Sequence, residues 1–551
     1  VEGFLSPGTY TLISGGSGTS APGSPAFTHN LPSGTRQSFD LQRSGGGSAN
    51  AHVRLVVGGS SSDLTWTGAT STWNLAGTTP WSGGAGGDNR FYNLDRVHFT
   101  DSAGNRTVSL SGALEPQSVT ASATAGSYTF TGSGSLAGNA RLVKEGGSTL
   151  VLDNTTANSH AGGTLVAGGA LVLGNAIAGL GGGPVELQGG TLELPASATF
   201  IDNSVVVTGD CAVVSPYGGN STLVDDYDES FSSVGTPTVD LAGVAGILSL
   251  KGPMDEFAGT LAFGAGSGTL RLNSGSDAAQ DANSGSPAAH FDLGTAGAAL
   301  TNRNGGRTLE IGALSGGSGT HLNGRQSGSG NTSTTYRIGA LGLDTRFDGT
   351  LSNGGDQAGL QLVKTGGGTL TLGGSSDFPG TVTVEAGTLA IPGALGVTGS
   401  TEVAPGAVLD LAGGSLATPS VQVRAGGTLL GPGTLHGELV NDGLLSCADG
   451  TLVVDGPVTN NGTARLTSGA VLSVSGEFVN HGVLDLLTAD GAIPDNLVNH
   501  GIVIDSSGLE LVAFGIDGDD FELRLATYEG HQYQLQASPD PGGTPWAGVG
   551  P

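Results

Sequence analysis

The sequence predicts an all-β protein, a right-handed parallel β-helix (β-solenoid) with about 19–20 residues per coil, flanked by β-rich terminal caps. Glycine accounts for 102 of the 551 residues, against about 7% in an average protein, so turns must be frequent. Apolar residues make up 37% of the chain, which is more than a disordered chain would contain. Turn motifs also recur at nearly constant spacing, which is typical of a repeat architecture.

The clearest repeat is an Asn-x-Gly turn, which occurs at Asn441, Asn460, Asn480 and Asn499 with spacings of 19, 20 and 19 residues. A period near 20 with strand signals and no helical pattern fits one coil of a β-solenoid. At one corner of successive coils, each Asn can donate its amide to the side-chain carbonyl of its neighbour, and the following Gly can supply positive φ. We therefore expect these residues to form a structural ladder and not a binding site.

Glycine-centred turns mark a similar period upstream. Four structural turns, each leading into a short strand, begin 19 residues apart at Gly349, Gly368, Gly387 and Gly406. Less regular Gly-Thr-Leu turns occur earlier, at Gly163, Gly190, Gly259 and Gly268. Because the turn-to-strand pattern continues through the chain, we expect the solenoid to run from about Leu142 to Asp505.

These patterns divide the chain into four segments. Residues 1–62 are an N-terminal β-rich segment, and residues 63–141 are a Trp-containing region that leads into the solenoid. Residues 142–505 form the parallel β-solenoid, and residues 506–551 form a C-terminal β-rich cap.

Two segments of the solenoid share a longer motif. In residues 142–173, a Leu-Val-Lys strand that ends at Lys144 is followed by a Gly-rich turn, a Thr-Leu-Val-Leu strand and then Gly-Thr-Leu. Residues 362–391 repeat this arrangement around Lys364. Both segments resemble the autotransporter-associated β-strand repeat, also called the passenger-associated transport repeat. The resemblance implies a long secreted or surface-displayed passenger with a β-helical stalk, and hence an extracellular or cell-surface location in a bacterium.

Charge, hydropathy and cysteine usage disfavour several alternatives. The chain has a net charge of −28, which would repel a phosphate backbone, so we expect no nucleic-acid binding. It contains no run of 18 apolar residues, so we expect no helical membrane span. Cys211 and Cys447 lie too many coils apart to form a bridge. No alternating strands after Asp505 resemble a membrane barrel, so we expect a barrel to lie outside this segment or the export route to differ.

We expect no catalytic residues and no cofactor. The main alternative is a polysaccharide lyase or hydrolase, whose site needs two or three carboxylates with Lys, Arg or His from neighbouring coils. Acids are sparse in the repeats, although the clusters Asp225–Glu229 and Asp517–Glu522 could bind Ca²⁺ or could simply be solvated. His481 and His500 should stack one coil apart, but without a third ligand at that corner we expect no metal site. The equivalent motif positions of Lys144 and Lys364 indicate a structural role.

The expected function is structural, as a surface stalk or a fibre outside the cell. A solenoid exposes unpaired strand edges at both ends, so residues 1–60 of one copy could dock head to tail on the C-terminal coils of the next, giving a homopolymer. The alternative is that both terminal regions are monomer caps. A further alternative is an adhesin that binds cell-surface or matrix glycans, for which the sequence carries no recognisable binding motif.

Overall fold

The computed structural model divides the chain into two compact units, Val1–Val382 and Thr383–Pro551. The division falls within strand β38 (Val382–Val384). The structure describes residues 6–14, 33–44, 52–273, 283–303, 306–325, 333–354, 359–467, 469–486, 489, 494–505, 511–517, 520–525, 536–537 and 547–548. From residue 511 onward, the description covers the backbone alone.

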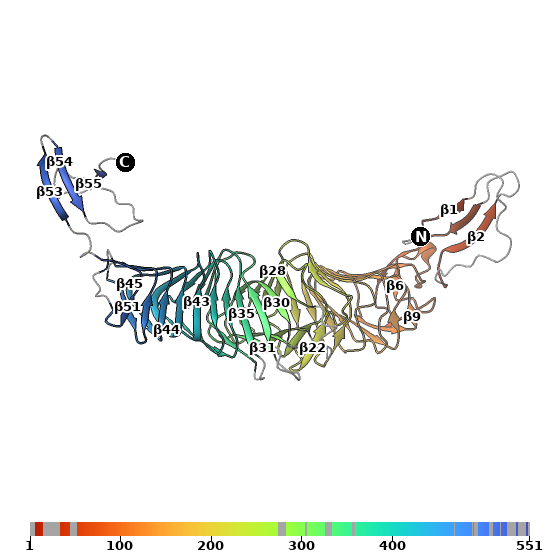
Figure 1. Ribbon diagram of the computed structural model, residues 1–551. Coiled ribbons are helices and arrows are strands. Elements are labelled where there is room, and N and C mark those ends of the chain that lie inside the picture. The colour runs from red at the N-terminus through yellow and green to blue at the C-terminus, as the bar shows by residue number, and fades with distance from the viewer. Residues whose placement is uncertain are drawn as a thin grey trace. The chain divides into compact units, whose positions relative to one another are not determined.

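The first unit is a stack of short parallel strands that form three long sheets (Figure 1). In spatial order, sheet I contains β23 (Phe231–Ser233), β20 (Val205–Val207), β17 (Val185–Leu187), β15 (Thr164–Val166), β13 (Arg141–Lys144), β10 (Ser118–Ala121), β7 (Arg96–Phe99), β4 (Asp63–Trp66) and the antiparallel β6 (Trp81–Ser82). Sheet II contains β19 (Phe200–Ile201), β22 (Asn220–Leu223), β25 (Ile247–Leu250), β27 (Thr269–Leu272), β29 (Ala299–Asn302), β31 (His321–Arg325) and β34 (Thr350–Ser352).

Sheet III runs along the whole first unit. In chain order, its strands there are β5 (Thr72–Asn74), β8 (Thr107–Ser111), β11 (Tyr128–Gly132), β14 (Thr149–Leu152), β16 (Ala170–Leu173), β18 (Thr191–Glu193), β21 (Cys211–Val214), β24 (Thr238–Asp240), β26 (Thr260–Ala262), β28 (Gly285–Asp292), β30 (Thr308–Ser315), β32 (Thr334–Ile338), β33 (Thr345–Phe347), β35 (Leu360–Lys364), β36 (Thr369–Leu372) and β37 (Ser375–Phe378). Two short strands, β9 (Ala113–Leu114) and β12 (Ser135–Leu136), pair separately, and η1 (Ala85–Gly87) is a single 3₁₀ turn.

The second unit is also built of parallel strands that stack from coil to coil. Its solenoid strands are β39 (Thr388–Ala390), β40 (Ala394–Val397), β41 (Thr401–Val403), β42 (Val408–Asp410), β43 (Ser415–Val423), β44 (Thr428–Asn441), β45 (Leu444–Asp455), β46 (Val458–Asn460), β47 (Thr463–Leu466), β48 (Val471–Val474), β49 (Phe478–Asn480), β50 (Val483–Asp485), β51 (Leu497–Asn499) and β52 (Ile502–Ile504). Two antiparallel pairs follow: β53 (Leu511–Asp517) with β54 (Asp520–Leu525), and β55 (Gln536–Ala537) with β56 (Ala547–Gly548).

The predicted all-β class and parallel β-solenoid are confirmed, and the described residues form about 18 turns. Backbone groups of each coil pair with the next coil, and side chains at the same position stand on one another. Leu150, Leu171 and Leu192 are register partners in three successive coils, and all three are fully buried. Columns of this kind make up the core, because alternate residues of each strand point inward.

The coil length matches the prediction in much of the second unit and departs from it in the first. Val458 pairs with Phe478, and Phe478 pairs with Leu497, so these two coils have the predicted length. In the first unit, by contrast, Thr260 pairs with His290, which makes that coil about half as long again.

The parallel stack begins earlier than the sequence predicts. Residues Asp63 to Thr65 already pair in parallel with β7, and β7 pairs with β10 in the same sheet. The Trp-containing region 63–141 therefore forms the first coils. Its tryptophans fill the start of the core: the rings of Trp66 and Trp81 lie 5.0 Å apart edge to face, and those of Trp73 and Trp81 lie 5.3 Å apart.

A small antiparallel sheet precedes the solenoid, with the order β1 (Gly8–Ser14), β3 (His52–Gly58) and β2 (Ser38–Ser44). The segment before β2 is attached to the first coil by Arg36, whose Nε donates to both carboxylate oxygens of Asp95 at 3.1 and 3.0 Å. Asp95 is fully buried and also accepts from the backbone N–H of Ser62. A buried carboxylate that receives several donors is held in one geometry, so this pair fixes where the chain enters the solenoid.

One buried histidine in the first unit has an unusual environment. His160 is fully buried, and its Nε2 lies 3.1 Å from Thr164 Oγ1, which itself donates to the carbonyl of Leu180. Thr164 must therefore accept from His160, which places the imidazole proton on Nε2. Nδ1 has no partner among the described residues. Burial lowers the pKa of His160 to about 4, because the protonated ring would be charged in an apolar surrounding.

This shift predicts a loss of stability in acid. The folded-state pKa lies below the unfolded-state value of about 6.5, so the unfolded chain binds more protons between these values. Neutral His160 contributes about 3 kcal/mol to the free energy of unfolding. This contribution is fully present above about pH 6.5 and is lost as the pH falls through 4. Denaturant unfolding at pH 7 and pH 4 should show a smaller pH effect in His160→Gln than in the unmodified chain. Equal pH effects would contradict this assignment.

Candidate functional site

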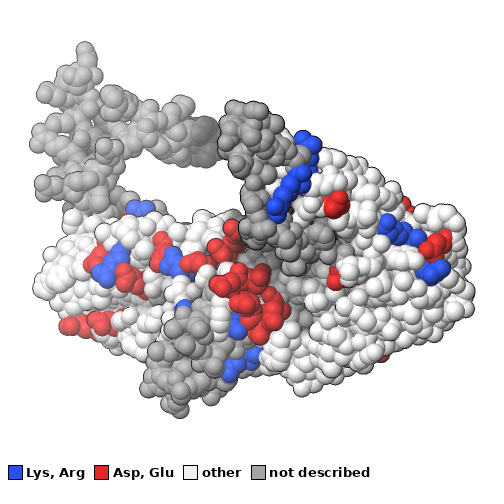
Figure 2. Space-filling view, turned by 90° about the vertical axis from the view of Figure 1, so that its right-hand side faces the viewer, with Lys and Arg blue, Asp and Glu red and all other residues white. Residues whose placement is uncertain are grey.

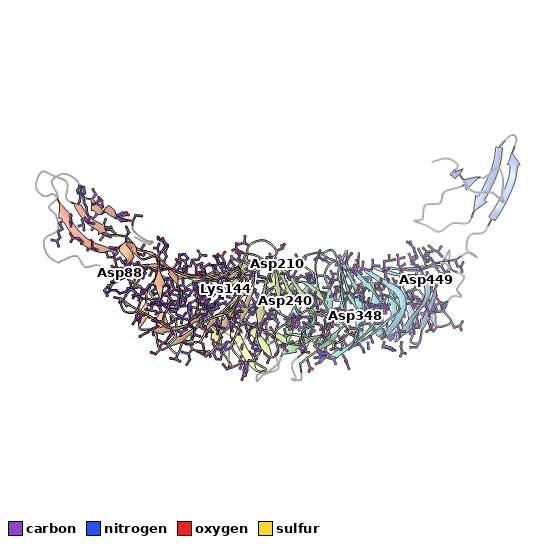
Figure 3. The ribbon with its side chains drawn as sticks, turned by 180° about the vertical axis from the view of Figure 1, so that it is seen from behind. Asp88, Lys144, Asp210, Asp240, Asp348 and Asp449 are labelled. Carbon is purple, nitrogen blue, oxygen red and sulfur yellow. The ribbon has the colours of Figure 1, made fainter. Side chains whose placement is uncertain are left out.

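The motif that begins at residue 142 occupies parts of two successive coils. β13 and β14 belong to one coil and β15 and β16 to the next, with Leu142 paired to Thr164 and Thr149 paired to Ala170. One copy of the motif therefore supplies strands of two successive coils that pair with each other. Lys144, which is labelled in Figure 3, is the last residue of β13 and precedes the turn that leads to β14.

The Lys144 side chain is directed into the protein and is fully buried. Its Nζ donates to the carbonyl oxygens of Glu145 at 2.8 Å, Gly146 at 3.0 Å and Gly168 at 2.9 Å. The first two belong to its own turn and the third to the turn of the next coil. An ammonium has three N–H donors, so all are used. Lys144 thus ties two stacked turns together, and the hydrogen bonds offset the cost of burying its charge.

Glycine is needed around this ammonium because the turns approach closely. Gly146 has φ +71 and Gly169 has φ +64, which are left-handed conformations that favour glycine. A Cβ on Gly169 would also lie 2.6 Å from Lys144 Nζ. The lysine and the glycines of the motif are therefore parts of one arrangement.

In the second copy of the motif, the lysine again donates to the carbonyls of its own turn. Lys364 ends β35, is 1% exposed, and donates from Nζ to the carbonyls of Thr365 at 2.6 Å and Gly366 at 2.9 Å. Gly366 has φ +68, equivalent to Gly146. Burial lowers the pKa of both lysines to about 8, while the nearby Glu145 and Asp344 act in the opposite direction. At neutral pH most of each lysine population is therefore protonated.

The structure places the four predicted Asn residues at one corner of successive coils. The side-chain Nδ2 of Asn441 donates to Oδ1 of Asn460 at 2.7 Å, Asn460 to Asn480 at 2.7 Å, and Asn480 to Asn499 at 2.7 Å. The first three members are fully buried, and Asn499 is exposed at the end of the ladder. Asn441 also donates to the backbone carbonyl of Thr463 at 3.0 Å. The ladder therefore joins both side chains and main chain of adjacent coils.

The four predicted glycine turns do not share one position, which corrects the interpretation of their spacing. Gly349 leads into β34 of sheet II, whereas Gly368 leads into β36 of sheet III. The coil there runs from Thr345 to its register partner Leu370, which is longer than the interval between the glycines, so that interval does not return to the same corner. In the second unit, Gly387 and Gly406 have φ +64 and +79, as turn glycines require.

The acidic cluster Asp225–Glu229 is the nearest approach to an enzyme-like grouping. Lys251 Nζ lies 3.7 Å from Asp225 and 4.0 Å from the centre of the Tyr227 ring. Burial raises the pKa of Asp225, and Lys251 acts in the opposite direction. Glu229 accepts from both the backbone N–H and the hydroxyl of Ser204. On the face in Figure 2, the largest acidic group lies near the centre, smaller acidic groups lie elsewhere beside basic side chains, and most of the surface is uncharged.

The remaining candidates from the sequence are placed as follows. The rings of His481 and His500 stack with centres 5.3 Å apart and planes 15° from parallel. Cys211 and Cys447 are both buried free thiols, and burial raises the pKa of Cys211 to about 12. The side chains of Asp517–Glu522 lie outside the described residues. Within the described part of the chain, no three His, Cys, Asp or Glu side chains are arranged to hold a metal ion.

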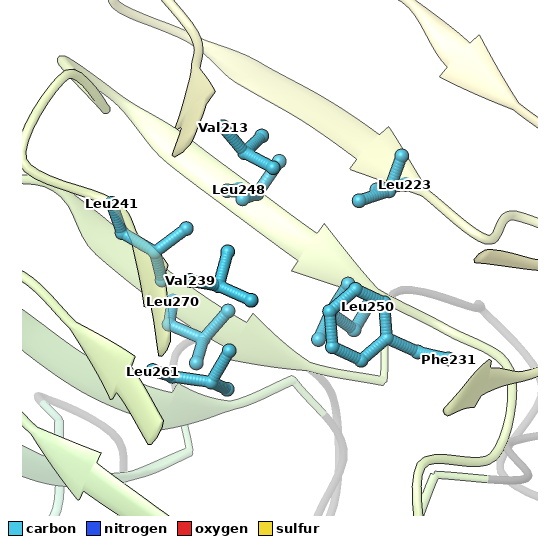
Figure 4. Close-up of a pocket in the computed structure, with 9 residues that line it drawn as sticks. All are labelled: Val213, Leu223, Phe231, Val239, Leu241, Leu248, Leu250, Leu261 and Leu270. Atoms are coloured by element: carbon cyan, nitrogen blue, oxygen red, sulfur yellow. The ribbon is translucent and has the colours of Figure 1, made fainter. Parts of the chain in front are cut away.

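A cavity of about 10 Å³ lies in the core of the first unit (Figure 4). Its lining is entirely apolar and includes Val213, Phe231, Leu250 and Leu270. A space of this size is at the lower limit for one water molecule, which would find no hydrogen-bond partner. It is a packing defect of the core and not a ligand site.

The family comparison matches the two segments that carry the buried lysines. A family model described as Passenger-associated-transport-repeat matches residues 142–173 and 362–391. The chain carries two passenger-associated transport repeats. No curated protein and no solved structure matches the chain. The two repeats and the β-solenoid together fit the passenger domain of an autotransporter.

Several contacts of the repeats were not foreseen from their sequence. The motif position of Lys144 indicated a structural role, but its carbonyl partners became visible only with the stacked turns. The pair Arg36 and Asp95 was missed because its members lie far apart in the sequence and no local pattern marks either one.

Among the described residues, no helix has the length and apolar character to cross a membrane.

Replacing Lys144 by Met should remove the donors from three turn carbonyls while keeping the aliphatic stem. We expect the free energy of unfolding to fall by about 2–4 kcal/mol, because buried acceptors are left without partners. The matched control is Arg141→Met on the same strand, whose ion pair with Glu186 is half-exposed and contributes about 0–1 kcal/mol. Equal stability of the two variants in denaturant unfolding would refute the role of the lysine.

Replacing Asn460 by Ala should interrupt the ladder in its middle. Asn441 then loses its acceptor and Asn480 loses its donor, so we expect a destabilisation of about 2–3 kcal/mol. The neighbouring exposed Asn461→Ala is the control and should change stability by about 0.5 kcal/mol or less. The amide hydrogen-exchange rates of β46, β47 and β49 should rise in Asn460→Ala and stay close to those of the unmodified chain in Asn461→Ala. Unchanged exchange in Asn460→Ala would show that the ladder is not stabilising.

Proposed function

We propose that this chain is a non-catalytic structural passenger, exported by a bacterium and exposed at its surface or secreted as a stalk. The observation that carries the proposal is the use of the repeat's lysine. Lys144 donates all three of its N–H groups to turn carbonyls of two coils. A buried amine that is fully engaged in this way is unsuited to act as a base or nucleophile on a substrate.

Contacts between coils at the surface support the same role. Arg337 pairs with Glu310 at 3.2 Å, and Arg465 pairs with Asp485 at 3.0 Å, in each case across adjacent coils. Each of these partly exposed pairs contributes little alone. These ion pairs and the Asn ladder join adjacent coils through polar side chains. Contacts of this kind hold a stalk together.

The enzyme alternative rests on the group around Lys251, and its contacts favour a structural reading. Lys251 is engaged by Asp225 and the ring of Tyr227, and Glu229 is engaged by Ser204. A lyase or hydrolase needs carboxylates and a base that are open toward a sugar. Here Lys251 lies within ion-pair distance of Asp225, and Glu229 already accepts hydrogen bonds from Ser204.

Head-to-tail assembly and glycan adhesion stay predictions. The aromatic cluster around Trp81 fills the start of the core, and the segment before β2 is bound to the first coil through Asp95. These features support a capped N-terminal end. The exposed Val498 and Ile502 in the last described coil support an end that still offers apolar surface.

The proposal is tested by a catalytic assay and a localisation experiment. The purified chain should release no product from acidic or neutral polysaccharides, and Lys251→Met should behave as the unmodified chain does. Depolymerisation that is lost in Lys251→Met would overturn the non-catalytic role. Antibodies against the solenoid should label intact, non-permeabilised cells of the source bacterium or detect the protein in the medium. Labelling that requires permeabilised cells would overturn the surface role.

A further inference from the structure

His481 and His500 occupy equivalent positions in the last two described coils. Each follows a ladder Asn, and the backbone N–H of each donates to the ladder Asn of the preceding coil, at 2.8 Å from His481 to Asn460 and 2.7 Å from His500 to Asn480. The same position is held by Asn461 one coil earlier, whose N–H donates to Asn441 at 2.8 Å. These bonds to backbone carbonyls therefore fix the main chain of the two histidines at equivalent positions one coil apart.

The two rings are accessible and uncommitted to hydrogen bonds with other described side chains. Both histidines are exposed, and their ring centres lie 5.3 Å apart with planes 15° from parallel. A metal ion at about 2.0–2.1 Å from each nitrogen would need the two nitrogens roughly 3 Å apart. Exposed rings can tilt toward each other to reach this separation, because the Cα atoms remain one coil spacing apart.

We propose that His481 and His500 form a two-imidazole chelate for a borderline transition-metal ion such as Zn²⁺, Ni²⁺ or Cu²⁺. Imidazole is a preferred ligand of these ions, whereas Ca²⁺ and Mg²⁺ take oxygen ligands. Solvent exposure allows water to complete the coordination sphere. The sequence led us to expect no metal site at this corner, because it offers no third protein ligand. The proposal departs from that expectation, since two imidazoles can hold an exposed ion when water supplies the other ligands.

The chelate would act as a clamp between coils. It joins β49–β50 to β51–β52, where Asn499 ends the ladder and Val498 and Ile502 are 38% and 36% exposed. Elements with few buried contacts open most readily. A bond between these two coils would therefore restrain strands whose residues Val498, Asn499 and Ile502 are exposed.

The test is isothermal titration of the tag-free full chain with ZnCl₂ or NiCl₂ at pH 7.5. We expect one ion per chain, and His481→Ala and His500→Ala should each weaken binding at least tenfold. The double variant should bind within about twofold of either single variant, because a chelate needs both rings. The matched control is His436→Ala, another exposed histidine of the second unit, which should bind as the unmodified chain does.

Two further readouts identify the ligands and the effect. Electron paramagnetic resonance of the Cu²⁺ complex should report two nitrogen ligands in the unmodified chain and at most one in each single variant. Metal should slow hydrogen exchange in β49–β52 of the unmodified chain and not in the variants. Absence of binding, retention of full affinity in either single variant, or loss of affinity in His436→Ala would overturn the proposal.

Discussion

The structure depends on the requirement that each coil pair its backbone with the next at a spacing of about 4.8 Å. This spacing brings each residue into contact with its equivalent one coil away. A residue type whose side chain packs or hydrogen-bonds well against a copy of itself can therefore be repeated at that position in many coils. Leucines at positions 150, 171 and 192 satisfy this condition in the core. Asn441 and its three equivalents satisfy it at a corner, since an amide is both donor and acceptor.

The turns present a harder problem, because carbonyls of two stacked turns can converge on one point, as the three that accept from Lys144 do. The chain contains two solutions. In the first unit, Lys144 and Lys364 insert an ammonium that gathers several carbonyls around one charge. In the second unit, the ladder amides use their second proton for the same purpose, as in the contact from Asn460 to the carbonyl of Val483 at 3.1 Å. A lysine serves one junction, whereas an amide can be repeated at every coil.

The sequence reveals those parts of the structure in which identical residues recur at a constant interval. The ladder and the stacked His481 and His500 could be read from spacing alone, because the coil length there is nearly constant. The same reasoning failed for Gly349, since the interval between the turn glycines is shorter than the local coil, which runs from Thr345 to Leu370. The early start of the stack at Asp63 and the ion pair of Arg36 with Asp95 were also missed. These depend on tertiary contacts between dissimilar residues, which leave no periodic trace in the chain.

The direction of the Asn contacts has a consequence for how such a chain can change in length. Each ladder member donates its amide proton forward along the chain and accepts one from behind, so every interior coil offers the same pair of contacts on its two faces. A tandem duplication of one coil's worth of codons within this stretch would insert a coil whose two interfaces already exist. Elongation or shortening by whole coils would then be nearly neutral for folding, whereas a shift by a few codons would misalign every amide that follows. Length variation in this part of the gene is accordingly expected to proceed in steps of one coil.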